Sequence, residues 1–220
     1  MSTPGHKSAG AHATDARPAV PHAAAPGTGM GSNRLEAFSD GVFAIIITIM
    51  VLELKVPHGT DWAALAPLAP VMLSYVISFV YIGIYWNNHH HLFQAVEQVG
   101  GGVLWANLHL LFWLSLFPFV TEWMGENHFA TEAVALYGVN LLMAGFAYSL
   151  LVRSLLKHHA PDSALRRAIG SDSKGKLSLA IYLAGIALSF YNARVAAALY
   201  VLVAVIWLVP DRRIEKVLVS

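Results

Sequence analysis

Three ionisable residues stand at the start of an otherwise apolar helix. The stretch RLEAFSDGVFAIIITIMVLELKVP, residues 34–57, has Arg34 and Glu36 near its beginning and Asp40 six residues after Arg34. At 1.5 Å per residue, Asp40 lies about 9 Å deeper than Arg34. An ionisable group at such depth in a membrane segment is rare and is functional by default. Because Arg34 and Asp40 are about 240° apart around the helix, their partners are expected on other helices.

A second polar cluster follows one apolar segment later. The sequence YWNNHHHLF, residues 85–93, ends the second apolar segment. Two consecutive spans run in opposite directions, so the end of the second reaches the membrane level at which the first begins. We expect a polar clamp that fixes the rotation of the first helix more than it adds stability, because interhelical hydrogen bonds in membranes contribute only about 0.6 kcal/mol on average. Its predicted members are Trp86, Asn87, His89 and His90 as partners of Arg34, Ser39 and Asp40.

The three consecutive histidines also raise the question of a metal site, because clustered imidazoles suit zinc or iron. Consecutive residues on a helix point about 100° apart, so His89, His90 and His91 cannot all face one ion. Cysteine is absent from the chain, which excludes disulfides, thiolate catalysis and iron–sulfur clusters. We therefore predict no catalytic residues, no metal and no cofactor.

In the rest of the first helix, large apolar side chains recur on one face. Ile45, Ile49 and Leu52 recur at i, i+4 and i+7 and form one stripe. Thr48 lies about 60° away from Ile45 around the helix. Periodicity alone favours a stripe that faces lipid or the core of the bundle. The same stripe can instead line a pore and narrow it by hydrophobic constriction.

The elements that carry these residues are membrane helices. The chain is 56% apolar and only 12% charged, with a mean hydropathy of +0.56; in soluble proteins charged residues are about a quarter. Apolar blocks of helical length argue for a helix bundle rather than a barrel of short alternating strands. The fold class predicted is an all-α integral membrane protein with six spans, at residues 35–56, 64–92, 103–123, 131–156, 177–192 and 194–210.

Domain limits and orientation follow from composition and charge. Residues 1–33 contain 8 Ala, 5 Gly and 4 Pro, which predicts a disordered tail. A six-span transmembrane domain is expected at 34–210, followed by a short tail at 211–220. With both termini cytoplasmic, 12 of the 14 Lys and Arg lie on the cytoplasmic side, as inner-membrane proteins prefer. The net charge of +1 gives no support for nucleic-acid binding.

At this point the motifs form a recognisable set. Arg34, Phe38, Ser39 and Asp40, spaced R-x-x-x-F-S-D, resemble the first-helix signature of the lysosomal potassium channel family (transmembrane protein 175 type), in its prokaryotic six-helix branch. YWNNHHHLF resembles the end of the family's second helix. NLHLLFWLSLFPFVTEW, residues 107–123, and LYVLVAVIWLVPDRR, residues 199–213, are similar to its third and last helices.

The resemblance implies a potassium-preferring cation channel in the cell membrane, with K⁺ as the permeant ion and no TVGYG filter. It implies a homotetramer in which the first helix of each subunit lines a central pore. Ile45 would then be the narrowest constriction, Ile49 and Leu52 the next layers, and Thr48 a hydroxyl layer that contributes to selectivity. The family also ties its R-F-S-D residues, here including Phe38, to Trp and His of the second helix.

Two other functions stay open from the residues alone. One is a proton-coupled or passive transporter of small cations with Asp40 and His89 as a relay. No internal repeat is visible in the six segments, which weighs modestly against a transporter that alternates access. The other is a membrane metalloenzyme that uses the histidines.

Overall fold

The computed structural model of the chain describes residues 30–94, 96, 98–157 and 173–208. Within these residues the secondary structure is helical apart from one antiparallel pair, β1 (Met30–Gly31) and β2 (Gln98–Val99), with Met30 opposite Val99. The predicted tail at 211–220 and most of the tail at 1–33 lie outside the described residues. The first helix begins at Ser32, two residues before the predicted domain limit.

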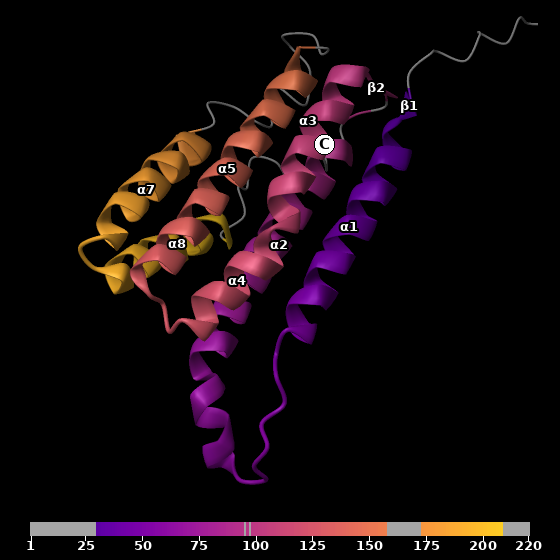
Figure 1. The fold of residues 1–220 in the computed structure, drawn as a ribbon. Coiled ribbons are helices and arrows are strands. Elements are labelled where there is room, and N and C mark those ends of the chain that lie inside the picture. Colours follow the sequence, from indigo (N-terminus) through magenta and orange to yellow (C-terminus); the bar gives the residue numbers. More distant parts are fainter. Residues whose placement is uncertain (1–29, 95, 97, 158–172, 209–220) are drawn as a thin grey trace, which may run out of the picture.

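Six longer helices and two shorter helical segments make up the described chain (Figure 1). α1 spans Ser32–Leu52 and leads through a loop and the 3₁₀ segment η1 (Trp62–Leu68) into α2 (Ala69–Gln94). After β2 come α3 (Gly101–Ser115), the shorter α4 (Phe117–Glu126) and α5 (Thr131–Leu156). The chain closes with the hairpin of α7 (Ser173–Ser189) and α8 (Ala193–Leu208).

The predicted third segment, 103–123, is interrupted rather than one regular helix. α3 ends at Ser115, and α4 begins at Phe117 with a proline in its first turn. Proline has no N–H, and its ring clashes with the carbonyl four residues earlier. Pro118 therefore breaks the ladder, while the N–H of Val120 still bonds the carbonyl of Leu116 at 3.1 Å and keeps the two pieces in line.

The prediction of a bundle of membrane helices is confirmed. Among the described residues, four segments have the length and apolarity to cross a bilayer: 32–52, 62–94, 101–126 and 131–156. α7 and α8 have only 17 and 16 residues. At 1.5 Å per residue each rises about 25 Å, less than the hydrocarbon thickness of about 30 Å. Six complete spans therefore stay a prediction, with α7 and α8 as the short ones.

α1 lies at one edge of the bundle, against α2, α3 and α4, and α7 and α8 lie at the opposite edge beside α5 (Figure 1). The core between these edges is apolar and aromatic. On the α7 and α8 side, Tyr200 reaches close to two glycines, since a Cβ at Gly138 would come within 2.0 Å of the Tyr200 hydroxyl and one at Gly185 within 2.4 Å of its ring. Small residues thus let the last helices pack closely.

Candidate functional site

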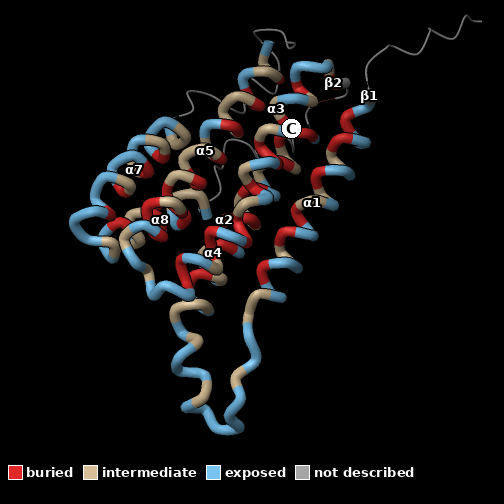
Figure 2. Tube along the Cα trace, in the orientation of Figure 1, coloured by how far each residue is buried: buried red, intermediate tan, exposed pale blue. Residues whose placement is uncertain are grey.

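α1 has two faces of opposite character. One faces the bundle and is buried, with Leu35, Phe43, Ile46 and Met50 each less than 5% exposed. The other stays uncovered along the whole helix (Figure 2). It carries the predicted stripe, in which Ile45 is 58%, Ile49 40% and Leu52 80% exposed. The stripe therefore does not pack into the core of its own subunit.

Thr48 lies on the same uncovered face. Its hydroxyl donates to the backbone carbonyl of Ile45 in the preceding turn, with an Oγ1 to O distance of 2.9 Å. The proton is thus turned toward the helix, and the oxygen keeps its lone pairs for a partner on the exposed side.

The buried face of α1 is joined to two other helices by a chain of hydrogen bonds. Ser39 donates to the carbonyl of Leu35 (2.9 Å) and accepts from Nδ2 of Asn107 on α3 (2.9 Å). His89 on α2 donates through Nε2 to Oδ1 of Asn107 (2.8 Å). Ser39, His89 and Asn107 are each 0% exposed. This chain of hydrogen bonds therefore holds α1, α2 and α3 together inside the protein, where a polar group without a hydrogen bond is costly.

His89 is also fixed by aromatic rings. The ring of Phe43 on α1 meets it edge-on at 5.7 Å between centroids, and the ring of Phe93, one turn along α2, lies at 4.6 Å. The Nδ1 atom of His89 is buried without a hydrogen-bond partner among the described residues. Packing and the bond to Asn107 thus set the orientation of this imidazole.

A second set of contacts ties the same two helices nearer the membrane edge. Trp86 Nε1 on α2 donates to Oδ1 of Asp40 at 3.0 Å. One turn on, His90 Nδ1 pairs with Oε1 of Glu36 at 2.6 Å, and Nε2 of His90 accepts from Gln94 at 2.8 Å. The rings of Trp86 and His90 stack at 6.0 Å. These contacts fix the rotation of α1 relative to α2.

Three predicted members lie outside this network. Arg34 and Asn87 are exposed and make no hydrogen bond or ion pair within the described part of the chain. Phe38 is 53% exposed on the uncovered face of α1. Arg34 lies in the first turn of α1 and Asn87 on the exposed side of α2, and neither side chain takes part in the contact between the helices.

Two residues that sequence reasoning left out carry central contacts. Asn107 bridges Ser39 and His89, and Glu36 pairs with His90. The sequence does contain an indication that Asn107 takes part in an interhelical contact: its amide lies within the apolar segment 103–123, where a polar group needs a partner. Glu36 lies near the beginning of the first apolar segment, where the sequence alone assigns it no partner.

The histidines do not converge on one point. His89 turns to Asn107 on α3, and His90 turns to Glu36 on α1. In the described residues no group of three or more His, Asp or Glu side chains is placed to hold a metal ion.

The C-terminal end of α1 is tied to α4. Lys55, in the loop after α1, pairs with Glu126 at 2.5 Å, and the two side chains are 67% and 42% exposed. The hydrogen bond to Glu126 and the charge of that carboxylate raise the pKa of Lys55 above its ordinary value. The pair joins the C-terminal ends of α1 and α4, at the end of α1 opposite the His90 contact.

Comparison with known proteins assigns this arrangement to a family. Residues 34–118 match the family described as endosomal/lysosomal potassium channel TMEM175. The chain is 57% identical over 187 residues to a potassium channel of Chryseobacterium sp. strain P1-3, covering 85% of this chain and 97% of that one. The chain belongs to the TMEM175 family. It is therefore a multi-pass membrane ion channel and not an enzyme.

Two further likenesses are to a solved structure and to a vertebrate protein. The crystal structure of a lysosomal potassium-selective channel TMEM175 homologue from Chamaesiphon minutus matches with a TM-score of 0.69 and 31% identity, covering 80% of this chain and 95% of that one. The endosomal/lysosomal proton channel TMEM175 of Gallus gallus is 31% identical over 144 residues, covering 58% of this chain and 29% of that protein.

Proposed function

We propose that this TMEM175-family chain forms a homotetrameric, potassium-preferring cation channel in which α1 of each subunit lines a central pore. The observation that carries the proposal is the stripe of Ile45, Ile49 and Leu52, which its own subunit leaves exposed while the opposite face of α1 is bonded to α2 and α3. A helix anchored on one face only presents the other to a neighbouring subunit, to a pore or to lipid.

The composition of the exposed face favours a pore and neighbouring subunits over lipid. Gly41, Ala44 and Thr48 lie on it beside the larger stripe residues and are exposed. Small and hydroxyl-bearing residues let helices approach closely and are typical of helix contacts in membranes. The names of the relatives agree with this, since two are called a potassium channel and a potassium-selective channel.

In the proposed pore, Ile45 forms the narrowest layer and Ile49 and Leu52 form the next ones, about 6 and 10.5 Å further along the helix. An apolar constriction imposes a desolvation barrier on every cation. Potassium holds its hydration shell less tightly than sodium and crosses more readily. The Thr48 oxygens replace part of the lost water, so the channel needs no TVGYG loop, and the sequence contains none.

The polar contacts behind α1 have a positioning role in this proposal. Asp40 and Ser39 hold the helix at a rotation that turns Ile45 toward the axis, because both residues bond to neighbouring helices from the opposite side. We place both termini in the cytoplasm on the charge bias of the loops. The proposed partners are three further copies of the chain, monovalent cations and the lipid bilayer, and the proposed pore needs no cofactor or metal.

The test is selectivity in planar bilayers with purified protein. In Ile45→Asn an amide replaces the constriction, and we expect sodium permeation to rise relative to potassium. Val51→Asn is the matched control, because Val51 is 44% exposed on the same helix but about 120° away from Ile45. An unchanged sodium-to-potassium permeability ratio in Ile45→Asn, or an equal change in Val51→Asn, would refute the constriction.

The second candidate function is a small-cation or proton transporter that uses Asp40 and His89, and the proton channel named among the relatives favours testing it. In the described residues the two groups belong to separate branches: Asp40 bonds Trp86, and His89 bonds Asn107. A relay between them thus lacks a continuous path of hydrogen bonds. Slow, saturable and pH-dependent flux in place of ohmic current would favour this function.

A further inference from the structure

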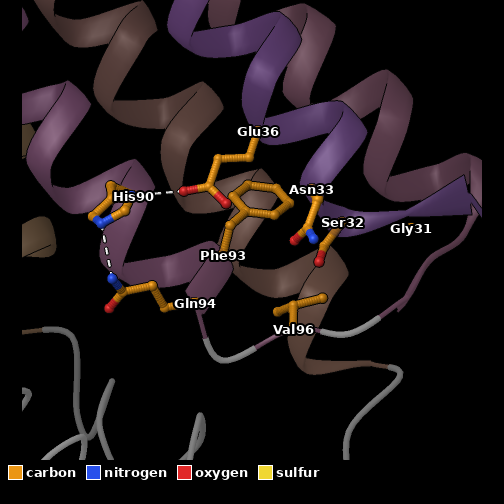
Figure 3. Close-up of a pocket in the computed structure, with 8 residues that line it drawn as sticks. All are labelled: Gly31, Ser32, Asn33, Glu36, His90, Phe93, Gln94 and Val96. Carbon is orange, nitrogen blue, oxygen red and sulfur yellow. Dashed lines mark hydrogen bonds and ion pairs between the residues drawn. The ribbon is translucent and has the colours of Figure 1, made fainter.

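A pocket opens where α1 begins and α2 ends. Its volume is about 440 Å³, within the usual range of about 300–1,000 Å³ for small-molecule sites. Both helices belong to segments that can cross a bilayer, so their shared end lies at a membrane–water interface. The lining residues are drawn in Figure 3: Gly31, Ser32, Asn33, Glu36, His90, Phe93, Gln94 and Val96.

One side of this pocket suits an anionic group. The N–H groups of the first helical turn have no partners within a helix, and no side chain caps α1, whose N-cap residue is Gly31. Ser32 is only 5% exposed, and its hydroxyl makes no hydrogen bond within the described residues. Figure 3 shows this hydroxyl turned into the pocket beside Asn33. A hydroxyl that faces the pocket and has no partner in the described residues is free to donate to an anionic ligand, as the first N–H groups of the helix are.

The other side suits a cation. Glu36 lies one turn along α1 from Ser32 and lines the same pocket. One of its carboxylate oxygens is bonded to His90, and the second makes no hydrogen bond within the described residues. The His90 ring is held from its other nitrogen by Gln94, which keeps it in place beside the carboxylate.

The two sides together limit what can bind. The carboxylate of Glu36 repels a ligand that is only anionic, and the positive end of the α1 dipole repels one that is only cationic. Ser32 and Glu36 are four residues apart, about 6 Å along the helix axis. A phosphate ester and a primary ammonium joined by two methylene groups span a distance of that order.

We propose that this pocket binds a phosphoethanolamine group, with its phosphate at Ser32 and the first turn of α1 and its ammonium at the second oxygen of Glu36. A primary ammonium donates hydrogen bonds to the carboxylate, whereas a trimethylated ammonium has none to donate. The group can come from a phosphatidylethanolamine headgroup of the surrounding membrane or from a soluble ester. The proposal concerns the end of α1 and does not rest on the pore.

The test is lipid binding to the purified full chain in detergent, followed by native mass spectrometry with phosphatidylethanolamine, phosphatidylglycerol and phosphatidylcholine of equal chain length. We expect phosphatidylethanolamine to bind at one site per chain and about tenfold more tightly than the other two. Ser32→Ala removes one hydrogen bond to the phosphate, and we expect it to weaken this binding about tenfold. Glu36→Gln should abolish the preference for phosphatidylethanolamine over phosphatidylcholine.

Two matched controls sit away from the pocket. Ser115→Ala changes an exposed serine at the far end of α3, and Glu126→Gln changes a carboxylate at the outer end of α4. Both should bind the three lipids as the unmodified chain does. Equal retention of all three lipids, or unchanged phosphatidylethanolamine binding in Ser32→Ala, overturns the proposal whether or not Glu36→Gln folds. If soluble phosphoethanolamine displaces the lipid, the pocket takes its ligand from solution. If the lipid binds and soluble phosphoethanolamine does not displace it, the ligand is the headgroup of a membrane lipid.

Discussion

Replacing Asn107 by leucine removes the centre of the buried hydrogen-bond chain while nearly conserving side-chain volume. The substitution leaves the Nε2 N–H of His89 without an acceptor and Ser39 without its donor, and both residues are 0% exposed. An orphaned buried donor costs about 1–3 kcal/mol, whereas interhelical hydrogen bonds in membrane proteins contribute about 0.6 kcal/mol on average. Because His89 has no route to water, we expect Asn107→Leu to lower the free energy of unfolding by about 1–3 kcal/mol.

A second buried asparagine offers a matched control for this substitution. Asn140, in the middle of α5, is 2% exposed, and neither its Oδ1 nor its Nδ2 has a partner among the described residues. Asn140→Leu therefore removes a buried polar group that makes no bond, and we expect it to be neutral or stabilising. The same side-chain change at two buried asparagines should thus have opposite or clearly different effects.

The assay is reversible unfolding of each variant in mixed micelles by increasing the mole fraction of dodecyl sulfate, followed by circular dichroism. Size-exclusion chromatography before unfolding checks that the variants are compared in the same oligomeric state. If Asn107→Leu unfolds at the same point as the unmodified chain, or if Asn140→Leu loses as much stability, the buried chain does not hold α1 in place.

Three further predictions concern the contacts around α1 and the core. Asp40→Ala removes the acceptor of the Trp86 indole, and we expect misassembly or loss of current, measured by chromatography and bilayer recording; a well-behaved oligomer with normal conductance would contradict the clamp. Gly138→Ala places a methyl group within 2.0 Å of the Tyr200 hydroxyl, and overpacking of this kind costs about 1–3 kcal/mol, which micelle unfolding measures. Lys55→Gln should change the melting temperature little at neutral pH, because exposed ion pairs contribute little to stability. Glu126 raises the pKa of Lys55 in the folded protein. Any stability that the pair adds is therefore present below pH 10.5 and is lost as the pH rises through the raised pKa.

Gly83→Ala provides the control for the glycine prediction. Gly83 lies inside α2, and a Cβ there would meet nothing within 4 Å. Alanine favours helix over glycine by about 1 kcal/mol, so this variant should be as stable as the unmodified chain or more stable. Equal losses at both glycines would show that the close approach of Tyr200 is not the cause.

Much of the architecture follows from the sequence because spans are set by the length of apolar blocks. Chain direction then brings the end of α2 to the start of α1, which is where Trp86 and Asp40 form their bond. The break at Pro118 was within reach of the same reasoning, since proline interrupts a helix wherever it falls in the interior.

The lateral order of the helices does not follow from the sequence. Chain order gives no indication that α3 lies against α1, so the bridge through Asn107 was missed. The rotation of α2 decides that His89 turns inward and His90 turns to Glu36, and three adjacent histidines leave that rotation open. Periodicity likewise cannot distinguish a core stripe from an exposed one, because Ile45 is apolar in either setting.

The most direct test of the account is the reversal potential of the purified chain in planar bilayers under a potassium-to-sodium gradient, compared with Ile45→Asn. We predict a reversal close to the potassium equilibrium potential with current proportional to driving force, and a shift toward zero in the variant. A reversal near zero in the unmodified chain, or the same reversal in both proteins, would contradict a potassium-preferring pore narrowed by Ile45.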